Sequence, residues 1–168
     1  LPLEPTTSDS LTCVVDVAAV DPEGDPVSYT YSWTIDGADA GMSETSVDPG
    51  QTARDEVWMC TVVPMDELEN VGPSASSAVT IGNSQPTPPE VSIQPSSPVL
   101  TDNLHCVVTS DSEDDDGDDV GYELQWVRNG VPTGYTEEMV PAQATEVGDL
   151  WTCSVTPNDG YVDGPQGE

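Results

Sequence analysis

The chain has 168 residues, of which 32 are Asp or Glu and only two are Lys or Arg, so its formal net charge at pH 7 is -30. A surface of that charge repels nucleic acid and anionic membranes, and no apolar run approaches the roughly 20 residues of a membrane-spanning helix. We therefore expect no nucleic-acid partner and no direct membrane insertion. Most of the acids are interpreted as solvated surface, and the excess charge suits divalent cations or cationic partners.

This length allows one domain or two domains of roughly 80 residues, and an internal repeat favours two. A pattern of two cysteines and two tryptophans occurs twice with identical spacing, the second time 93 residues after the first (106 - 13 = 93). It contains every Cys and Trp of the chain. The two copies are Cys13, Trp33, Trp58 and Cys60, and Cys106, Trp126, Trp151 and Cys153.

Strands in the first copy are predicted from apolar residues at alternate positions. Residues 11–17 have this period, and residues 27–35 show it most clearly. The second of these segments ends at Asp36-Gly37, which favours a hairpin because both residues tolerate a positive φ. After the turn-rich loop 18–26 and this hairpin, further strands are expected at 38–42, 45–47, 57–63 and 76–81.

A proline-rich segment at residues 83–89 is predicted to be an extended, stiff linker between the copies. In the second copy we expect strands at 90–93, 104–108, 120–127 and 150–155, with a hairpin turn at Asn129-Gly130. Pro and Gly interrupt every window of helical period. The predicted fold class is therefore all-β.

The two copies differ at their ends. The strand expected at 90–93 has no counterpart before Leu1, and the strand expected at 76–81 has no counterpart after Gly164-Pro165. Unpaired sheet edges of this kind are unfavourable. We expect the chain to be a window cut from a longer tandem array, and the alternative is that neighbouring molecules supply the missing strands.

The cysteines form two equivalent pairs in a chain of small domains, which predicts disulfides and an oxidising compartment. The competing hypothesis is a zinc site. It is disfavoured because no Cys has a second Cys within a few residues and because His105 is the only histidine.

The framework resembles the immunoglobulin pattern, in which a Cys is followed about twenty residues later by a Trp and then by a second Cys. Residues 33–37 and 126–130 match the W-x-x-[DN]-G of its third strand, although Trp58 and Trp151 stand where antibody domains have a corner tyrosine. The loops 21–27 and 114–120 are similar to those of PKD-like and cadherin-like repeats. The whole unit resembles the disulfide-bearing immunoglobulin-like repeats of large bacterial surface proteins.

This resemblance implies two tandem immunoglobulin-like β-sandwiches, at residues 1–82 and 90–168, joined by the linker 83–89. The first sandwich lacks its first strand and the second lacks its last. Each would have one inter-sheet disulfide, Cys13 with Cys60 and Cys106 with Cys153, packed against its tryptophans. Closing a loop of 47 residues stabilises a domain by about 4 kcal/mol in the chain-entropy model, which would support a core without any Phe.

Two acidic loops are candidate calcium sites, because calcium takes six to eight oxygen ligands and clustered carboxylates supply them. The alternative is a mobile, solvated loop, and the spacing does not satisfy an EF-hand. Calcium is the one cofactor considered, and the second loop is the better candidate. The candidate ligands are Asp111, Glu113, Asp114, Asp116 and Asp118 in the second copy, and Asp21, Glu23 and Asp25 in the first.

We do not expect an enzyme, because no phosphate-binding loop, nucleophile elbow or dinucleotide fingerprint is present. The expected function is that of a structural module, a stalk, spacer or filament subunit, of an extracellular or cell-surface bacterial protein. The alternative is a calcium-stabilised module that recognises a ligand or carbohydrate. Expected partners are neighbouring repeats or copies of the chain itself, with surface glycans or proteins as further candidates.

Overall fold

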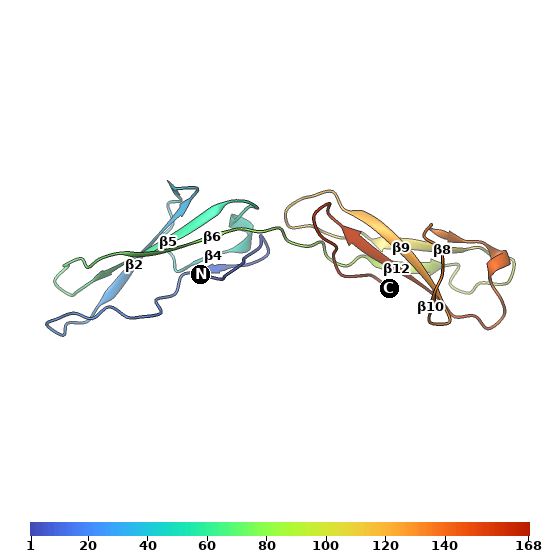
Figure 1. The fold of residues 1–168 in the computed structure, drawn as a ribbon, viewed down its shortest axis with the longest axis horizontal. Coiled ribbons are helices and arrows are strands. Elements are labelled where there is room, and N and C mark those ends of the chain that lie inside the picture. The colour runs from blue at the N-terminus through green and yellow to red at the C-terminus, as the bar shows by residue number, and fades with distance from the viewer. The chain divides into compact units, whose positions relative to one another are not determined.

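The computed structural model describes all residues from Leu1 to Glu168 and confirms the all-β class. The chain divides into two compact units, Leu1–Ser84 and Gln85–Glu168, each built from antiparallel sheets (Figure 1). The only helical elements are two short 3-10 turns, Pro49–Gln51 and Ala142–Ala144. No helix has the length and apolar character of a membrane span.

The first unit has one four-stranded and one two-stranded sheet. The larger has the order β3-β2-β5-β6, and β2, β5 and β6 lie side by side in Figure 1; the smaller is β1-β4. The strands are β1 (Leu11–Thr12), β2 (Ser28–Ile35), β3 (Ala38–Asp39), β4 (Ser46–Val47), β5 (Val57–Met65) and β6 (Ala75–Thr80).

The second unit has two three-stranded sheets. Their orders are β10-β9-β12 and β11-β8-β7. The strands are β7 (Glu90–Gln94), β8 (Leu104–Ser110), β9 (Gly121–Arg128), β10 (Val131–Pro132), β11 (Met139–Val140) and β12 (Trp151–Asn158).

Both predicted hairpins form. Asp36 and Gly37 have φ values of 51° and 81°, and Asn129 and Gly130 have 53° and 78°. Two consecutive positive φ angles match the twist of the flanking strands. The turns therefore align β2 with β3 and β9 with β10 in register.

The two sheets of each unit share one core. Opposite residues in register bring Trp33 next to Cys60 and Trp126 next to Cys153, which places each tryptophan beside the disulfide. The buried core of the first unit is Leu11, Cys13, Trp33, Val47, Trp58, Cys60, Val62 and Ile81. That of the second is Leu104, Cys106, Trp126, Val140, Cys153 and Val155.

The disulfides join Cys13 to Cys60 and Cys106 to Cys153, with Cα atoms 6.3 and 6.0 Å apart. The first joins the residue directly after β1 to β5 and the second joins β8 to β12, so each links the two sheets of its unit. The tryptophans pair edge to face, with centroids 6.1 Å apart in both units. Edge-to-face geometry brings the positive edge of one ring to the negative face of the other, and it stabilises the pair beyond what burial of their apolar area contributes.

One predicted strand is much shorter than expected. Alternation predicts a strand over residues 11–17, but β1 contains only Leu11–Thr12, whereas the equivalent β8 extends over Leu104–Ser110. The difference lies in the neighbours, because β8 pairs with both β11 and β7 while β1 pairs with β4 alone. Because β4 and β11 each pair over only two residues, the greater length of β8 comes from its ladder with β7, and residues 13–17 have no such partner.

The segment predicted as a linker packs against the units. The Ser84 hydroxyl hydrogen-bonds that of Thr7 at 2.7 Å within the first unit. In the second unit Pro86 is fully buried, and a Cβ on Gly164 would collide with its carbonyl. The absence of a side chain at Gly164 therefore permits this close approach.

We expect the double substitution Cys106→Ala/Cys153→Ala to lower the free energy of unfolding of the second unit by about 4 kcal/mol, because the cross-link closes a 47-residue loop. Hydrogen exchange read by mass spectrometry resolves the two units. Protection should fall in β8, β9 and β12, while β2 and β5 serve as the internal control. Unchanged protection in β12 would contradict the stabilising role.

Candidate functional site

Three carboxylates converge in the loop between β8 and β9. Ligand oxygens of Asp114, Asp116 and Asp118 lie within 4.8 Å of one another, and all three residues are half-buried. The backbone creates this arrangement: Asp114 Oδ1 accepts hydrogen bonds from the amides of Asp116 and Asp118, at 2.9 and 3.2 Å. Gly117, with φ +76°, donates its amide to the Asp114 carbonyl at 3.1 Å and closes the turn.

This aspartate triad could hold a metal ion. Asp114 Oδ2 is buried and has no hydrogen-bond partner, while its other oxygen is used by the loop. Three negative charges at this separation repel one another, and a bound cation would remove that repulsion. Three monodentate carboxylates fall short of the six to eight oxygens that calcium takes, so backbone carbonyls, bidentate carboxylates or water would complete the shell.

The other candidate ligands of this loop lie outside the triad. Asp111 and Glu113 are exposed. The backbone of Glu113 is tied to Thr87, whose hydroxyl accepts its amide at 2.7 Å and whose amide donates to its carbonyl at 2.8 Å. Glu113 therefore anchors the loop to the segment that precedes β7.

The equivalent loop of the first unit has the same backbone form without a carboxylate cluster. Asp21 Oδ1 accepts the amides of Glu23 and Asp25 at 2.8 and 3.2 Å, and Gly24 has φ +90°. Asp21, Glu23 and Asp25 do not form a group with metal-ligating distances. The position of half-buried Asp116 is taken here by Glu23, which has a longer side chain and is exposed.

A tyrosine hydroxyl holds each of these loops in place. Tyr29 Oη accepts the amide of Ala19 at 2.7 Å, and Tyr122 Oη accepts that of Ser112 at 2.8 Å. Alternation predicts that both rings face the core but does not predict this second role. The feature of the sequence that could have indicated this role is a constant spacing, because each tyrosine follows the first Asp of its loop by eight residues (29 - 21 and 122 - 114).

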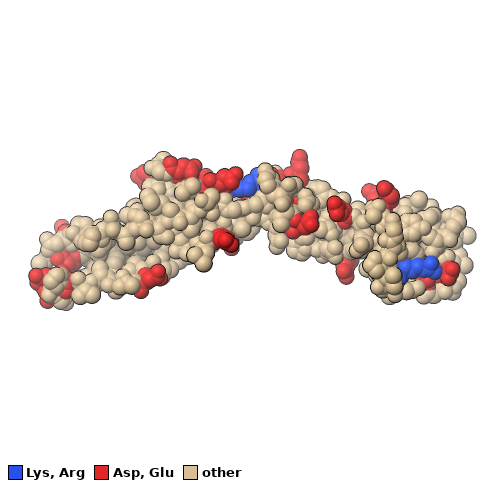
Figure 2. All heavy atoms as spheres, in the orientation of Figure 1, with Lys and Arg blue, Asp and Glu red and all other residues tan.

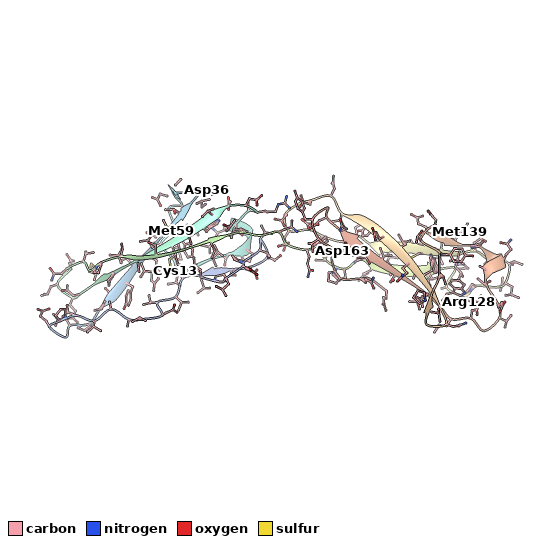
Figure 3. The ribbon with its side chains drawn as sticks, in the orientation of Figure 1. Cys13, Asp36, Met59, Arg128, Met139 and Asp163 are labelled. Carbon is pink, nitrogen blue, oxygen red and sulfur yellow. A yellow bond between two sulfur atoms is a disulfide. The ribbon has the colours of Figure 1, made fainter.

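A second charged site, which the sequence analysis did not identify, surrounds Arg128 at the end of β9 (Figure 3). Arg128 Nε lies 2.8 Å from Asp149 Oδ2, a second guanidinium nitrogen lies 3.1 Å from Glu146, and the guanidinium carbon lies 5.9 Å from the centroid of the Trp151 ring. Asn129 Nδ2 donates to Asp149 Oδ1 at 3.0 Å. The cluster ties the β9–β10 hairpin to the segment before β12.

These contacts shift the pKa values of both partners. The hydrogen bond to Asp149 is the main cause that raises the pKa of Arg128. For Asp149, partial burial by itself raises the pKa, but the hydrogen bonds from Arg128, the Glu146 amide and Asn129 outweigh it, and the net pKa is lowered. The Asp149 side chain is 8% exposed, which makes it the partner most shielded from water.

The acids visible on one face of the molecule are dispersed. Figure 2 shows Asp and Glu side chains scattered over the visible face of each unit, without one continuous patch.

No family model matches the chain, and no curated protein matches it in sequence.

We expect the stabilising effect of the Asp149 carboxylate to depend on pH. Because its folded-state pKa lies below the unfolded value of about 3.9, its contribution is complete above that value and is lost as the pH falls through the folded-state pKa. The difference in free energy of unfolding between the natural chain and Asp149→Asn should therefore be constant near neutral pH and shrink in acid. Urea denaturation at a series of pH values measures it.

Arg128→Met is the matched variant, since it removes the cation and retains the packing of a long side chain against Trp151. In that background Asp149→Asn should have a smaller effect, because only the hydrogen bonds from the Glu146 amide and Asn129 to the carboxylate remain. A difference between the natural chain and Asp149→Asn that does not change with pH would contradict the assignment of this ion pair.

Proposed function

We propose that each unit is an immunoglobulin-like β-sandwich and that the chain is a non-enzymatic structural module, a stalk, spacer or filament subunit, of an extracellular or cell-surface bacterial protein. The observation that carries the proposal is the repeated cross-link. Each unit has a buried disulfide that connects its two sheets and closes a 47-residue loop. Neighbouring repeats or further copies of the chain are the partners of such a module.

The location and the role are supported by separate features. Disulfides persist in oxidising compartments, which favours a place outside the cytoplasm. A cross-link that traps residues 13–60 or 106–153 limits how far a unit extends under load, which suits a part that transmits force. The net charge of -30 favours a solvated surface that resists association with other acidic surfaces.

Single-molecule force spectroscopy tests this role on the full chain. In the oxidised protein the residues between the paired cysteines stay locked when a unit unfolds. Reduction should lengthen each unfolding step by about 160 Å, from 47 residues at roughly 3.4 Å each.

The variant Cys13→Ala/Cys60→Ala is the internal control, because it should lengthen only one of the two steps. Steps of full length in the oxidised natural chain would contradict a load-limiting role. Antibodies to the chain should label intact cells of the source organism, and labelling confined to lysed cells would exclude the proposed location.

A calcium-stabilised module is the second candidate, and the aspartate triad is the observation that favours it. We propose that Asp114, Asp116 and Asp118 bind calcium and that the ion stiffens the loop between β8 and β9. Carboxylate oxygens suit this hard cation, and neutralising three adjacent charges stabilises the folded unit. The first unit, which lacks such a triad, is expected to respond much less.

The double substitution Asp116→Asn/Asp118→Asn tests calcium binding and leaves Asp114 in place as the acceptor that shapes the loop. Without calcium this variant should be more stable than the natural chain, because two repelling charges are removed. With calcium its affinity should fall at least tenfold by isothermal titration, and the rise in melting temperature that EDTA reverses should disappear.

Asp111→Asn/Asp119→Asn is the matched control, since it makes the same change of charge in the same loop outside the triad. It should retain the calcium response. An equal loss of response in both variants would indicate a diffuse ion atmosphere, and a natural chain whose melting temperature calcium does not shift would refute the site.

A further inference from the structure

The outer face of the four-stranded sheet in the first unit has no charged side chain on its three long strands. No residue of β2, β5 or β6 is charged, although 20% of the residues in the chain are. Trp33 and Cys60 pair in register and belong to the core, so the alternate positions of these strands point outward. The outward residues, which we call the neutral face, are Ser28, Thr30, Ser32 and Thr34 of β2, Met59, Thr61 and Val63 of β5, and Ser76, Ala78 and Thr80 of β6.

Acidic side chains surround the neutral face. Asp36 directly follows β2 and Glu56 directly precedes β5 at one end of the sheet, and Asp66 directly follows β5 at the other end. Asp39 lies on β3, at one edge of the sheet. Figure 3 labels Asp36 at the end of β2 and Met59 within the sheet. An uncharged centre inside a polar, charged rim is the arrangement found in protein–protein interfaces.

The corresponding face of the second unit does carry charge. Strands β9 and β12 pair in the same register as β2 and β5, with an offset of 93 residues. There Glu123 takes the position of Thr30, and Gln125 takes that of Ser32. Soluble proteins carry charged residues over much of their surface. The lack of charge on the neutral face therefore does not follow from the strand pairing that the two units share.

Several hydroxyl groups of the neutral face are satisfied within the sheet. The hydroxyls of Thr61 and Ser76 hydrogen-bond each other at 3.1 Å, and the Ser28 hydroxyl donates to the Met65 carbonyl at 3.1 Å. These groups keep a partner when water leaves the face, so the cost of removing that water is small. A sugar would bring hydroxyls of its own that need partners, which favours a protein surface as the occupant. The apolar side chains among the hydroxyls are Met59, Val63 and Ala78.

The charge of the molecule points to a second copy as that occupant. Two chains of net charge -30 repel each other along their acidic surfaces, and the repulsion is weakest where neither contributes a charge. A second copy offers an identical neutral face, and a two-fold axis brings the same residues of both copies together. A basic partner would instead be attracted to the acidic loops.

We propose that the neutral face is a self-association site, through which the first units of two copies of the chain pack sheet against sheet. The eight residues of β2 and the width of three strands give the face dimensions of roughly 26 by 14 Å, or about 370 Å² on each copy. Both copies together bury roughly 740 Å², which is below the about 1,200 Å² of a stable interface. The contact is therefore transient and forms at high local concentration.

This inference rests on the proposal that copies of the chain are its partners, and it names the face through which they meet. The two can fail separately. Full-length unfolding steps in the oxidised chain would contradict the load-limiting role without bearing on this contact. A monomeric chain would contradict the contact without changing those steps.

Sedimentation equilibrium of the full chain, from micromolar to millimolar concentration, measures the association. The dimer fraction should rise with concentration and also with added sodium chloride, because salt screens the repulsion between the acidic rims. In the isotopically labelled chain, the amide resonances of β2, β5 and β6 should shift with concentration, while those of β7 and β8 should not.

The variant Thr30→Glu places a carboxylate from each copy in the contact and should weaken dimerisation at least tenfold. The strand pairing tolerates this residue, because Glu123 stands at the corresponding position of the second unit. Thr12→Glu is the matched control, since it makes the same change at an exposed threonine in the other sheet, and it should retain the association. Thr30→Gln, which is similar in size and uncharged, should weaken dimerisation less than Thr30→Glu.

A chain that stays monomeric at millimolar concentration in high salt would overturn the proposal. So would concentration-dependent shifts confined to the second unit, or equal weakening by Thr30→Glu and Thr12→Glu, which would mean that added charge acts at any position. If the chain stays monomeric and dextran shifts the resonances of β2, β5 and β6, the occupant is an uncharged polysaccharide and the assignment to a second copy is wrong.

Discussion

The structure depends most on the contact between a disulfide and a tryptophan at the centre of each unit. Cross-strand pairing places Trp33 directly opposite Cys60, and the Trp33 indole donates to the Glu44 carbonyl at 2.8 Å, so one ring joins the disulfide, the core and a loop. Trp126 repeats this at 2.9 Å to the Glu137 carbonyl. In units of this size without any Phe, few other side chains could supply the same buried area.

Around this common centre the two units are completed differently. The first has a fourth strand, β6, beside β5 and only two strands in its other sheet, while the second has β7 beside β8 and three strands in each sheet. At the end of the chain only Gly167 pairs with Val155, at the position that corresponds to the start of β6. The length of β8 compared with β1 therefore depends on the neighbouring strand β7 more than on alternation within the strand itself.

The acidic loops show how one backbone form can have different chemistry. In both, the first aspartate accepts two amides of its own loop and a tyrosine hydroxyl anchors the preceding residues. This arrangement is structural and needs no ion. Only in the second unit do three aspartates at alternate positions bring their carboxylates together. In the first unit the middle position is Glu23, whose side chain is one methylene longer and exposed, and the three carboxylates do not converge.

Local pattern by itself determined the all-β class, the two hairpin turns, the cysteine pairs and the inward face of each long strand, because alternation, turn residues and repeat spacing act over a few residues or recur exactly. Only the tertiary structure decided that residues 11–17 pair over just two positions, that Arg128 meets Asp149, and which acids of a crowded loop converge. These outcomes depend on which distant segment lies alongside and on where the folded backbone directs each side chain, and neither is contained in a local pattern.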